Sequence, residues 1–219
     1  MYDIYNFVTG PLVWIAFIIF VVGSIYRLAS MYALAKKKDA VSLAYMDWKF
    51  SFRSIINWLI PFNSLGWKAN PALTVVTFIF HVLLLLTPIL LSAHVILFSD
   101  SWGFSWWTIS DNTANYMTMA IIAACIFFAV RRFYLRDVRF LTTSQDWLIL
   151  ALVALPFVTG LLAYYQLFNY QIMLIAHVVV GCLVIAAIPF TRLSHMLFAV
   201  FTRSYIGSEF GKIRRAKDW

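Results

Sequence analysis

Four histidines are the residues of this sequence best suited to chemistry. His81 and His94 lie in one long apolar run, and His177 and His195 lie in or at the edge of another. An ionisable side chain is costly inside a lipid bilayer, so a histidine in a membrane-spanning segment is a functional candidate by default. Imidazole is an axial ligand of haem iron. Two helices that each carry one histidine near either membrane face could therefore hold two haems, one above the other.

The composition places the chain in the class of membrane proteins. It is 63% hydrophobic and 12% charged, whereas an ordinary soluble domain has about 25% charged residues. Several apolar runs approach or exceed the ~20 residues that a helix needs to cross a bilayer. They are continuous rather than alternating, which indicates helices. We expect a single all-α domain over residues 1–219, with five membrane helices at about 8–30, 72–97, 113–132, 146–168 and 171–196.

The basic residues predict the orientation of these helices. All 17 Lys and Arg residues lie at the end of the first run or in the loop after it, between the third and fourth runs, or at the end of the fifth run and beyond. The segments on the other side carry only Asp3, Asp100 and Asp111. Basic residues concentrate on the cytoplasmic side, so we expect the N-terminus outside and the C-terminus in the cytoplasm. The net charge of +8 is then explained by basic residues that set the membrane orientation, and nucleic-acid binding is not expected.

The first cytoplasmic loop contains an amphipathic segment at about 48–60. Its apolar residues share one helical face, its polar residues line the opposite face, and Pro61 ends it; the apolar residues are Trp48, Phe52, Ile55, Ile56 and Leu59. Such a segment is typical of a helix lying in the membrane interface. It serves either as an anchor or cap on the bundle, or as a docking surface for a cytoplasmic partner.

This topology pairs the histidines by depth. His81 should lie level with His195 near the cytoplasmic side, and His94 level with His177 near the outer side. His177 and His195 are 18 residues apart, which is five turns and a rise of roughly 27 Å, so they share a face. The 13 residues between His81 and His94 turn a straight helix by about 140°. We therefore expect a kink at Pro88 to bring both onto the site.

Other uses of the histidines fit the pattern less well. No two of them are neighbours on a helix turn, as a zinc site would favour. A proton relay would need acidic partners, and no Asp or Glu lies deep in any run. Imidazoles on both sides of a haem iron leave no open position, which favours electron transfer. The rival hypothesis is a non-redox membrane anchor or transporter with structural histidines, although transporters usually show a repeat that is not evident here.

Two neighbouring residues fit a haem site. Gly181 lies one turn after His177, where it either leaves room for a macrocycle or packs against another helix. Arg192 lies three residues before His195. Its guanidinium either pairs with a propionate of the inner haem or is one of the topological charges.

The chain also resembles a known family. The five helices, the histidine spacing and the TRLSHM segment are similar to the gamma (cytochrome b) subunit of respiratory nitrate reductase. The stretches NFVTGPLVWIAF, AIPFTRLSHMLF and SEFG resemble, more closely, the membrane subunit of transmembrane cytochrome c:menaquinone oxidoreductase complexes of sulfate-reducing bacteria. The gap between His81 and His94 is longer than in the nitrate reductase subunit, and the outer side lacks that subunit's lysine.

The resemblance implies a respiratory function. It implies two haems b and menaquinone as cofactors, in a multi-pass subunit of the bacterial inner membrane. Electrons would pass between menaquinone or menaquinol and a cytoplasmic iron–sulfur subunit similar to heterodisulfide reductase, with a periplasmic multihaem cytochrome c as a further partner. It also implies a quinone site near the outer haem, for which the outer-side candidates are Asp100, Asp111, Asn112, Tyr165 and Gln166.

Overall fold

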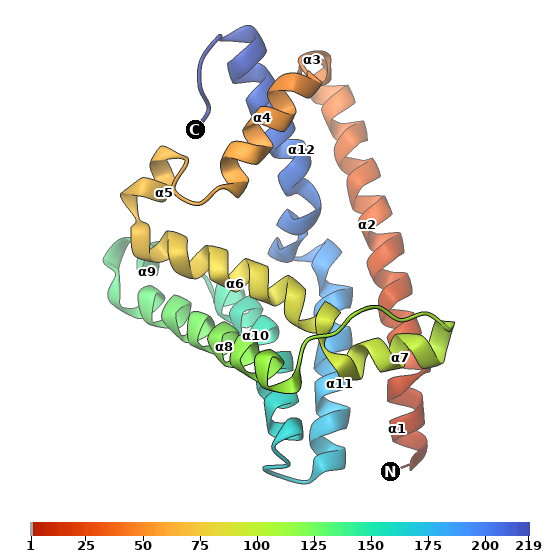
Figure 1. The fold of residues 1–219 in the computed structure, drawn as a ribbon. Coiled ribbons are helices and arrows are strands. Elements are labelled where there is room, and N and C mark those ends of the chain that lie inside the picture. Colours follow the sequence, from red (N-terminus) through yellow and green to blue (C-terminus); the bar gives the residue numbers. More distant parts are fainter. Residues whose placement is uncertain (1) are drawn as a thin grey trace. The chain divides into compact units, whose positions relative to one another are not determined.

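The chain is almost wholly helical over residues 2–219, which the computed structural model describes (Figure 1). Its α-helices are α1 (Tyr2–Thr9), α2 (Pro11–Lys38), α3 (Ala40–Ala44), α4 (Trp48–Leu59), α5 (Leu65–Ala69), α6 (Pro71–Leu90), α7 (Ser92–Trp102), α8 (Asp111–Tyr134), α9 (Arg136–Leu141), α10 (Ser144–Tyr164), α11 (Tyr170–Ala187) and α12 (His195–Ser208). The 3₁₀ turns η1 (Ile188–Phe190) and η2 (Arg192–Ser194) precede α12, and the π-helical turn η3 (Glu209–Ile213) follows it.

Within residues 2–219, five helical segments are long and apolar enough to cross a membrane. They are Tyr2–Lys38, Pro71–Leu90, Asp111–Tyr134, Ser144–Tyr164 and Tyr170–Phe190. Each overlaps one of the five predicted runs, which confirms the all-α membrane fold. The first segment continues to Lys38, beyond its expected end near residue 30, because the residues between Arg27 and Lys36 also favour helix.

The chain divides into two compact units. One consists of the described residues up to Gly10 together with Val76–Gly181, and the other of Pro11–Val75 together with Cys182–Trp219. Each unit joins segments that are far apart in the sequence. The single-domain organisation of residues 1–219 stays a prediction.

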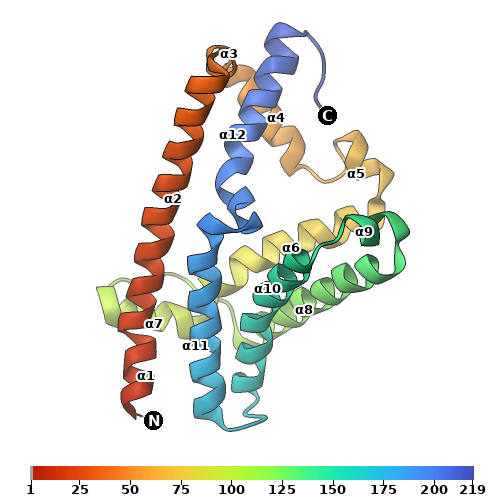
Figure 2. The same cartoon turned by 180° about the vertical axis from the view of Figure 1, so that it is seen from behind.

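In the first unit, α8 and α10 lie side by side (Figure 2). The Phe80 ring on α6 meets the Phe128 ring on α8 edge to face, with 5.3 Å between centroids. Small and branched residues fill the interior, including Ala114, Ile121 and Val153, all buried. Ser110 caps the start of α8 by accepting a hydrogen bond from the Thr113 N–H, which satisfies one of the free amide groups at the helix start.

The predicted helix at 72–97 is wrong as one continuous element. The α-helix ends at Leu90, Leu91 is extended, and a new helix begins at Ser92. Leu91 forms an isolated bridge with Ile109 instead. The expected irregularity between His81 and His94 is therefore present as a break at Leu91, three residues after Pro88, which lies inside α6.

The predicted helix at 171–196 is also discontinuous. The α-helix ends at Ala187, the 3₁₀ turns η1 and η2 follow, and Thr191 between them is extended. Pro189 has no N–H to donate, which favours an end to the regular helix there. Because His177 and His195 lie on opposite sides of this break, their 18-residue spacing no longer places them on one face of a continuous helix.

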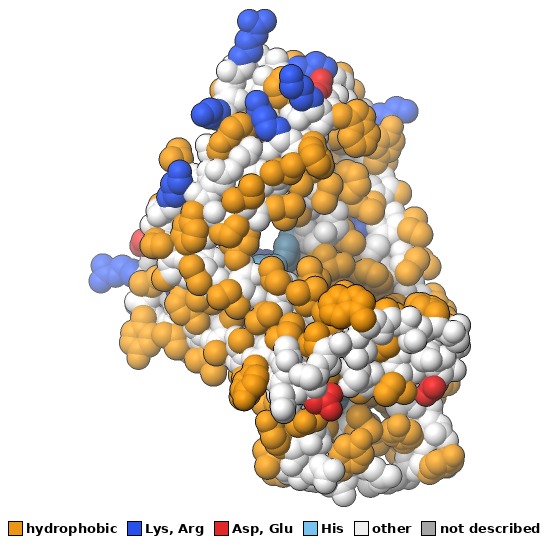
Figure 3. Space-filling view, viewed as in Figure 1, with side chains coloured by type: hydrophobic (Ala, Val, Ile, Leu, Met, Phe, Trp, Pro, Cys, Tyr) orange, Lys and Arg blue, Asp and Glu red, His pale blue; other side chains and the backbone are white. Residues whose placement is uncertain are grey.

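The second unit is held together by α4 and α12, which lie side by side (Figure 1). Small residues let the two backbones approach: a Cβ added at Gly207 would lie 2.3 Å from the Ser54 Cβ. Ser51 Oγ donates to the Ser204 carbonyl across the junction at 3.2 Å. The predicted segment at 48–60 is thus a helix, Trp48–Leu59. Lys and Arg side chains gather at the end of this unit that carries α3 and the tail (Figure 3).

Candidate functional site

The break at Leu91 positions His94. It leaves the carbonyl oxygens of Pro88, Ile89 and Leu90 without the helical N–H partners that a continuous helix would supply. The His94 ring Nδ1 donates a hydrogen bond to the Pro88 carbonyl at 2.8 Å. The Trp106 indole N–H donates to the Ile89 carbonyl at 2.8 Å, and the Ile109 N–H donates to the Leu90 carbonyl at 3.0 Å. The imidazole is therefore held by the end of the preceding helix.

His177 on α11 is held by α10 in a similar way. Its Nδ1 donates to the Pro156 carbonyl oxygen at 2.9 Å. Gly160 lies one turn after Pro156 and allows this approach, because a Cβ there would lie 3.0 Å from His177 Cε1 and 3.1 Å from Nδ1. Any larger residue at 160 would press on the ring.

The two imidazoles lie close together within the first unit. Their ring centroids are 6.0 Å apart and their planes differ by 23°. Two imidazoles on opposite sides of one metal, each with a metal–nitrogen bond of about 2 Å, would have centroids roughly 6 Å apart. Because each Nδ1 carries the proton that it donates to a carbonyl, each Nε2 carries the lone pair that ligation needs. His94 and His177 therefore fit the axial ligand pair of a haem.

The other two histidines share this hydrogen-bond pattern. His81 Nδ1 donates to the Thr77 carbonyl at 2.8 Å, and His195 Nδ1 to the Arg192 carbonyl at 2.8 Å. All four rings are thus oriented by a backbone carbonyl, as metal-bound histidines usually are. His81 belongs to the first unit and His195 to the second. Their pairing at an inner haem stays a prediction.

The neighbours singled out from the sequence lie at the following positions. Gly181 has open space beside it, because a Cβ built there would meet no atom within 4 Å. Arg192 opens η2 and is exposed. Gly181 and Arg192 as haem-binding residues stay predictions.

The quinone candidates all lie in the first unit. Asp111 opens α8 and accepts a hydrogen bond from Ser92 at 2.9 Å, two residues before His94. Asn112 follows it, Asp100 lies on α7, and Tyr165 and Gln166 follow the end of α10 at Tyr164. Asp111 is thereby tied to the start of the helix that carries His94. Assignment of any of them to a quinone stays a prediction.

The sequence reading missed the residues that hold the rings. Pro88 and Pro156 supply carbonyl oxygens, and Gly160 supplies space. One signal was available: Pro156 and Gly160 are four residues apart in an apolar run, so they share a helix face. No group of three or more His, Cys, Asp or Glu side chains within residues 2–219 is arranged to hold a metal ion. A haem iron takes four nitrogens from its macrocycle, so two imidazoles complete it.

Comparison with known proteins gives one relative at high coverage. No family model matches the chain, and no solved structure matches it. A protein of Nitratidesulfovibrio vulgaris, strain Hildenborough, is 33% identical over 210 residues, which cover 94% of this chain and 93% of the relative. The name of that protein assigns no activity. The chain belongs to the same family as this Nitratidesulfovibrio vulgaris protein.

Proposed function

We propose that the chain is a membrane-embedded di-haem cytochrome b that carries electrons between menaquinone or menaquinol and a cytoplasmic iron–sulfur subunit. The subunit is of the kind related to heterodisulfide reductase, and a periplasmic multihaem cytochrome c is a further partner. His94 and His177 ligate the outer haem, and His81 and His195 the inner one. The N-terminus faces outward and the protein resides in the bacterial inner membrane.

The pairing of His94 with His177 carries this proposal. The rings come from helices α7 and α11, which are remote in sequence, yet their centroids are 6.0 Å apart with planes 23° from parallel. Two neutral imidazoles gain little from such an arrangement by themselves. Neighbouring ring charges would in fact oppose each other if both were protonated. If His94 and His177 both hold the iron of one haem, that role would account for the separation.

The chain's own residues prepare the ligands. Carbonyl oxygens of Pro88 and Pro156 hold the protons on Nδ1 and fix the ring orientations. His177 lies in one of the apolar segments that could cross a membrane, and lipid around that segment would lower the dielectric at the site. When bound, a haem supplies one-electron transfer between ferrous and ferric iron. Two histidine ligands would leave no position for oxygen on the iron, so these residues would favour electron transfer alone.

A redox titration by visible spectroscopy tests the proposal. The purified full-length chain is reduced with a water-soluble menaquinol analogue, and the difference spectrum is recorded. We expect a b-type α-band that appears on reduction and disappears when ferricyanide is added. If dithionite produces the band but the quinol does not, the quinone half of the proposal is wrong. If neither reductant produces it, the chain is a non-redox membrane anchor or transporter subunit with structural histidines.

A further inference from the structure

The tail segment, residues 214–219, folds back onto the junction of α4 and α12. Asp218 provides the main contact of this segment with the junction, and its side chain is only 1% exposed. Its carboxylate forms an ion pair with Arg203 of α12 and accepts a hydrogen bond from the Ser54 hydroxyl of α4. The Trp219 ring packs under the Arg53 guanidinium, 4.7 Å from its centre. The chain therefore places an anion of its own in this junction.

The junction offers more hydrogen-bond donors than this carboxylate uses. Arg203 donates from Nε and Nη2 to Ser54 Oγ at 3.0 and 2.8 Å. Arg53 Nη2 lies 3.9 Å from Asp218 Oδ1, which is too far for a hydrogen bond. The buried Nε and Nη2 atoms of Arg53 have no hydrogen-bond partner, nor does Asp218 Oδ1. Two guanidinium groups thus face a single carboxylate that satisfies only one of them.

Buried hydrogen-bond donors without an acceptor destabilise a protein. Here the unpaired Arg53 donors lie beside the Asp218 carboxylate that pairs with Arg203. Burial lowers the pKa of Arg203, while the Asp218 carboxylate acts in the opposite direction. A phosphate group has more acceptor oxygens than a carboxylate and matches the guanidinium fork. It could engage Arg53 and Arg203 together, with the Ser54 hydroxyl between them. Asp218 would then have to leave the junction.

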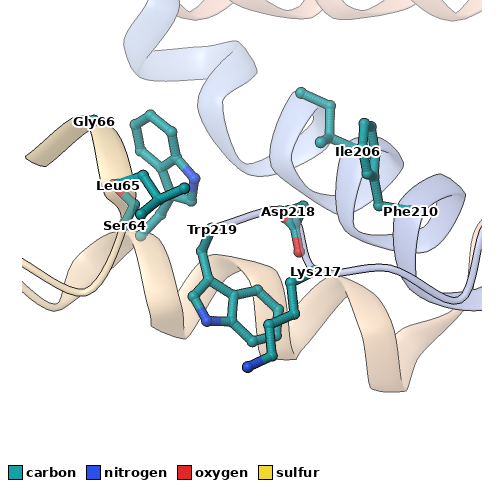
Figure 4. A pocket seen from close by; sticks show the side chains of 9 residues that line it. Ser64, Leu65, Gly66, Ile206, Phe210, Lys217, Asp218 and Trp219 are labelled. Atoms are coloured by element: carbon teal, nitrogen blue, oxygen red, sulfur yellow. The ribbon is translucent and has the colours of Figure 1, made fainter.

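An apolar pocket of about 340 Å³ opens beside Asp218. Leu65, Ile206 and Phe210 line it together with Trp58 and Trp219, and Lys217 lies at its edge. In Figure 4 the tail residues Lys217, Asp218 and Trp219 lie between α5 and the side chains of Ile206 on α12 and Phe210 on η3. A site with a cationic end and an apolar chamber suits an amphipathic ligand better than a free inorganic ion.

We propose that this junction binds the phosphate headgroup of an anionic membrane lipid, and that Asp218 is an internal anion which the headgroup displaces. Arg53, Arg203 and Ser54 hold the phosphate, and the pocket takes the glycerol and the first part of an acyl chain. The neighbouring Trp58 and Trp219 are suited to the lipid–water boundary. The site does not depend on haem.

Lipid retention measured by native mass spectrometry tests the site. The full-length chain is transferred from bilayer discs of phosphatidylcholine containing phosphatidylglycerol into detergent, and retained lipids are counted. We expect Arg53→Gln to weaken phosphatidylglycerol binding roughly tenfold, as loss of a charge-assisted hydrogen-bond pair does. Lys49→Gln is the matched control, because it removes the same charge one turn earlier on α4, from a residue that is exposed. It should leave retention unchanged.

Asp218→Asn provides the opposite test. Removing the competing carboxylate should strengthen phosphatidylglycerol binding several-fold. Equal losses in Arg53→Gln and Lys49→Gln would show general surface attraction and overturn the site, and weaker binding in Asp218→Asn would overturn the displacement. Excess inorganic phosphate distinguishes the source. A headgroup site keeps its lipid in phosphate buffer, whereas loss of the lipid to phosphate with the same dependence on Arg53 would assign the site to a soluble phosphate ester.

Discussion

His177 Nδ1 donates a hydrogen bond to the carbonyl oxygen of Pro156, 2.9 Å away on the neighbouring helix. This contact decides both the direction of the ring and its tautomer. The ring nitrogen left with a lone pair is Nε2. In the proposed function, this carbonyl of α10 would orient a haem ligand on α11.

The first prediction concerns the outer pair. His177→Ala and His94→Ala should each lower the haem content from two to one per chain, because one imidazole holds a haem much less firmly than two. The haem that remains should be the same in both variants, with one midpoint potential. The measurement is haem per protein together with a potentiometric titration. Loss of different haems in the two variants would show that these residues do not share an iron.

The second prediction concerns the inner pair. His81→Ala and His195→Ala should each remove the other haem and leave the outer one. All four double variants that combine one residue from each pair, such as His81→Ala with His177→Ala, should then contain none. The same titration identifies the surviving haem by its potential. If His81→Ala and His94→Ala remove the same haem, the assignment of ligands to depths is wrong.

The third prediction concerns Gly160. Gly160→Val should displace the His177 ring, since even a Cβ would lie 3.0 Å from Cε1. We expect lower occupancy of the outer haem and a shifted potential, with the inner haem unchanged. Gly66→Val is the control, because a Cβ at Gly66 meets no atom within 4 Å. An unchanged outer haem in Gly160→Val would refute a positioning role for this glycine.

The fourth prediction concerns the junction of α4 and α12. Gly207→Val should force the helices apart, because a Cβ there would lie 2.7 Å from the Phe50 carbonyl oxygen. Overpacking of this kind typically costs about 1–3 kcal/mol of unfolding free energy. Thermal unfolding in detergent measures it, again with Gly66→Val as the reference. A melting temperature that is the same in both variants would contradict the close packing.

The fifth prediction concerns orientation. Cys125 and Cys182 are buried, so a membrane-impermeant maleimide should label the native chain weakly in intact cells. With the N-terminus outside, a cysteine at Ser101 should be labelled in intact cells, and a cysteine at Lys37 only after the membrane is opened. The reverse pattern would invert the proposed topology and exchange the inner and outer haems.

Composition and periodicity predicted the helical membrane class because long apolar runs leave few alternatives. The helix ends were harder to predict. Leu91 is extended although nothing about leucine favours it; the break is stabilised by Trp106 and Ile109, which reach the free carbonyls from a distant loop. Such partners are tertiary and cannot be seen in a local pattern.

The sequence singled out the histidines of the candidate site but not the groups that hold their rings. Histidine in an apolar run is rare enough to stand out. Every residue has a backbone carbonyl, so no side-chain pattern marks Pro156 or Pro88 as the residue whose carbonyl orients a ring. The polar residues of α4 were expected on the helix face opposite its apolar residues, and they lie there. Arg53, however, contacts the tail rather than open water.

The number of haems b in the purified wild-type chain tests the central claim most directly. A pyridine haemochrome assay, normalised to protein by amino-acid analysis, gives this number without assumptions about partners or direction of electron flow. The account predicts two haems b per chain. A chain that is folded and purified from haem-replete cells, yet contains none, would contradict it.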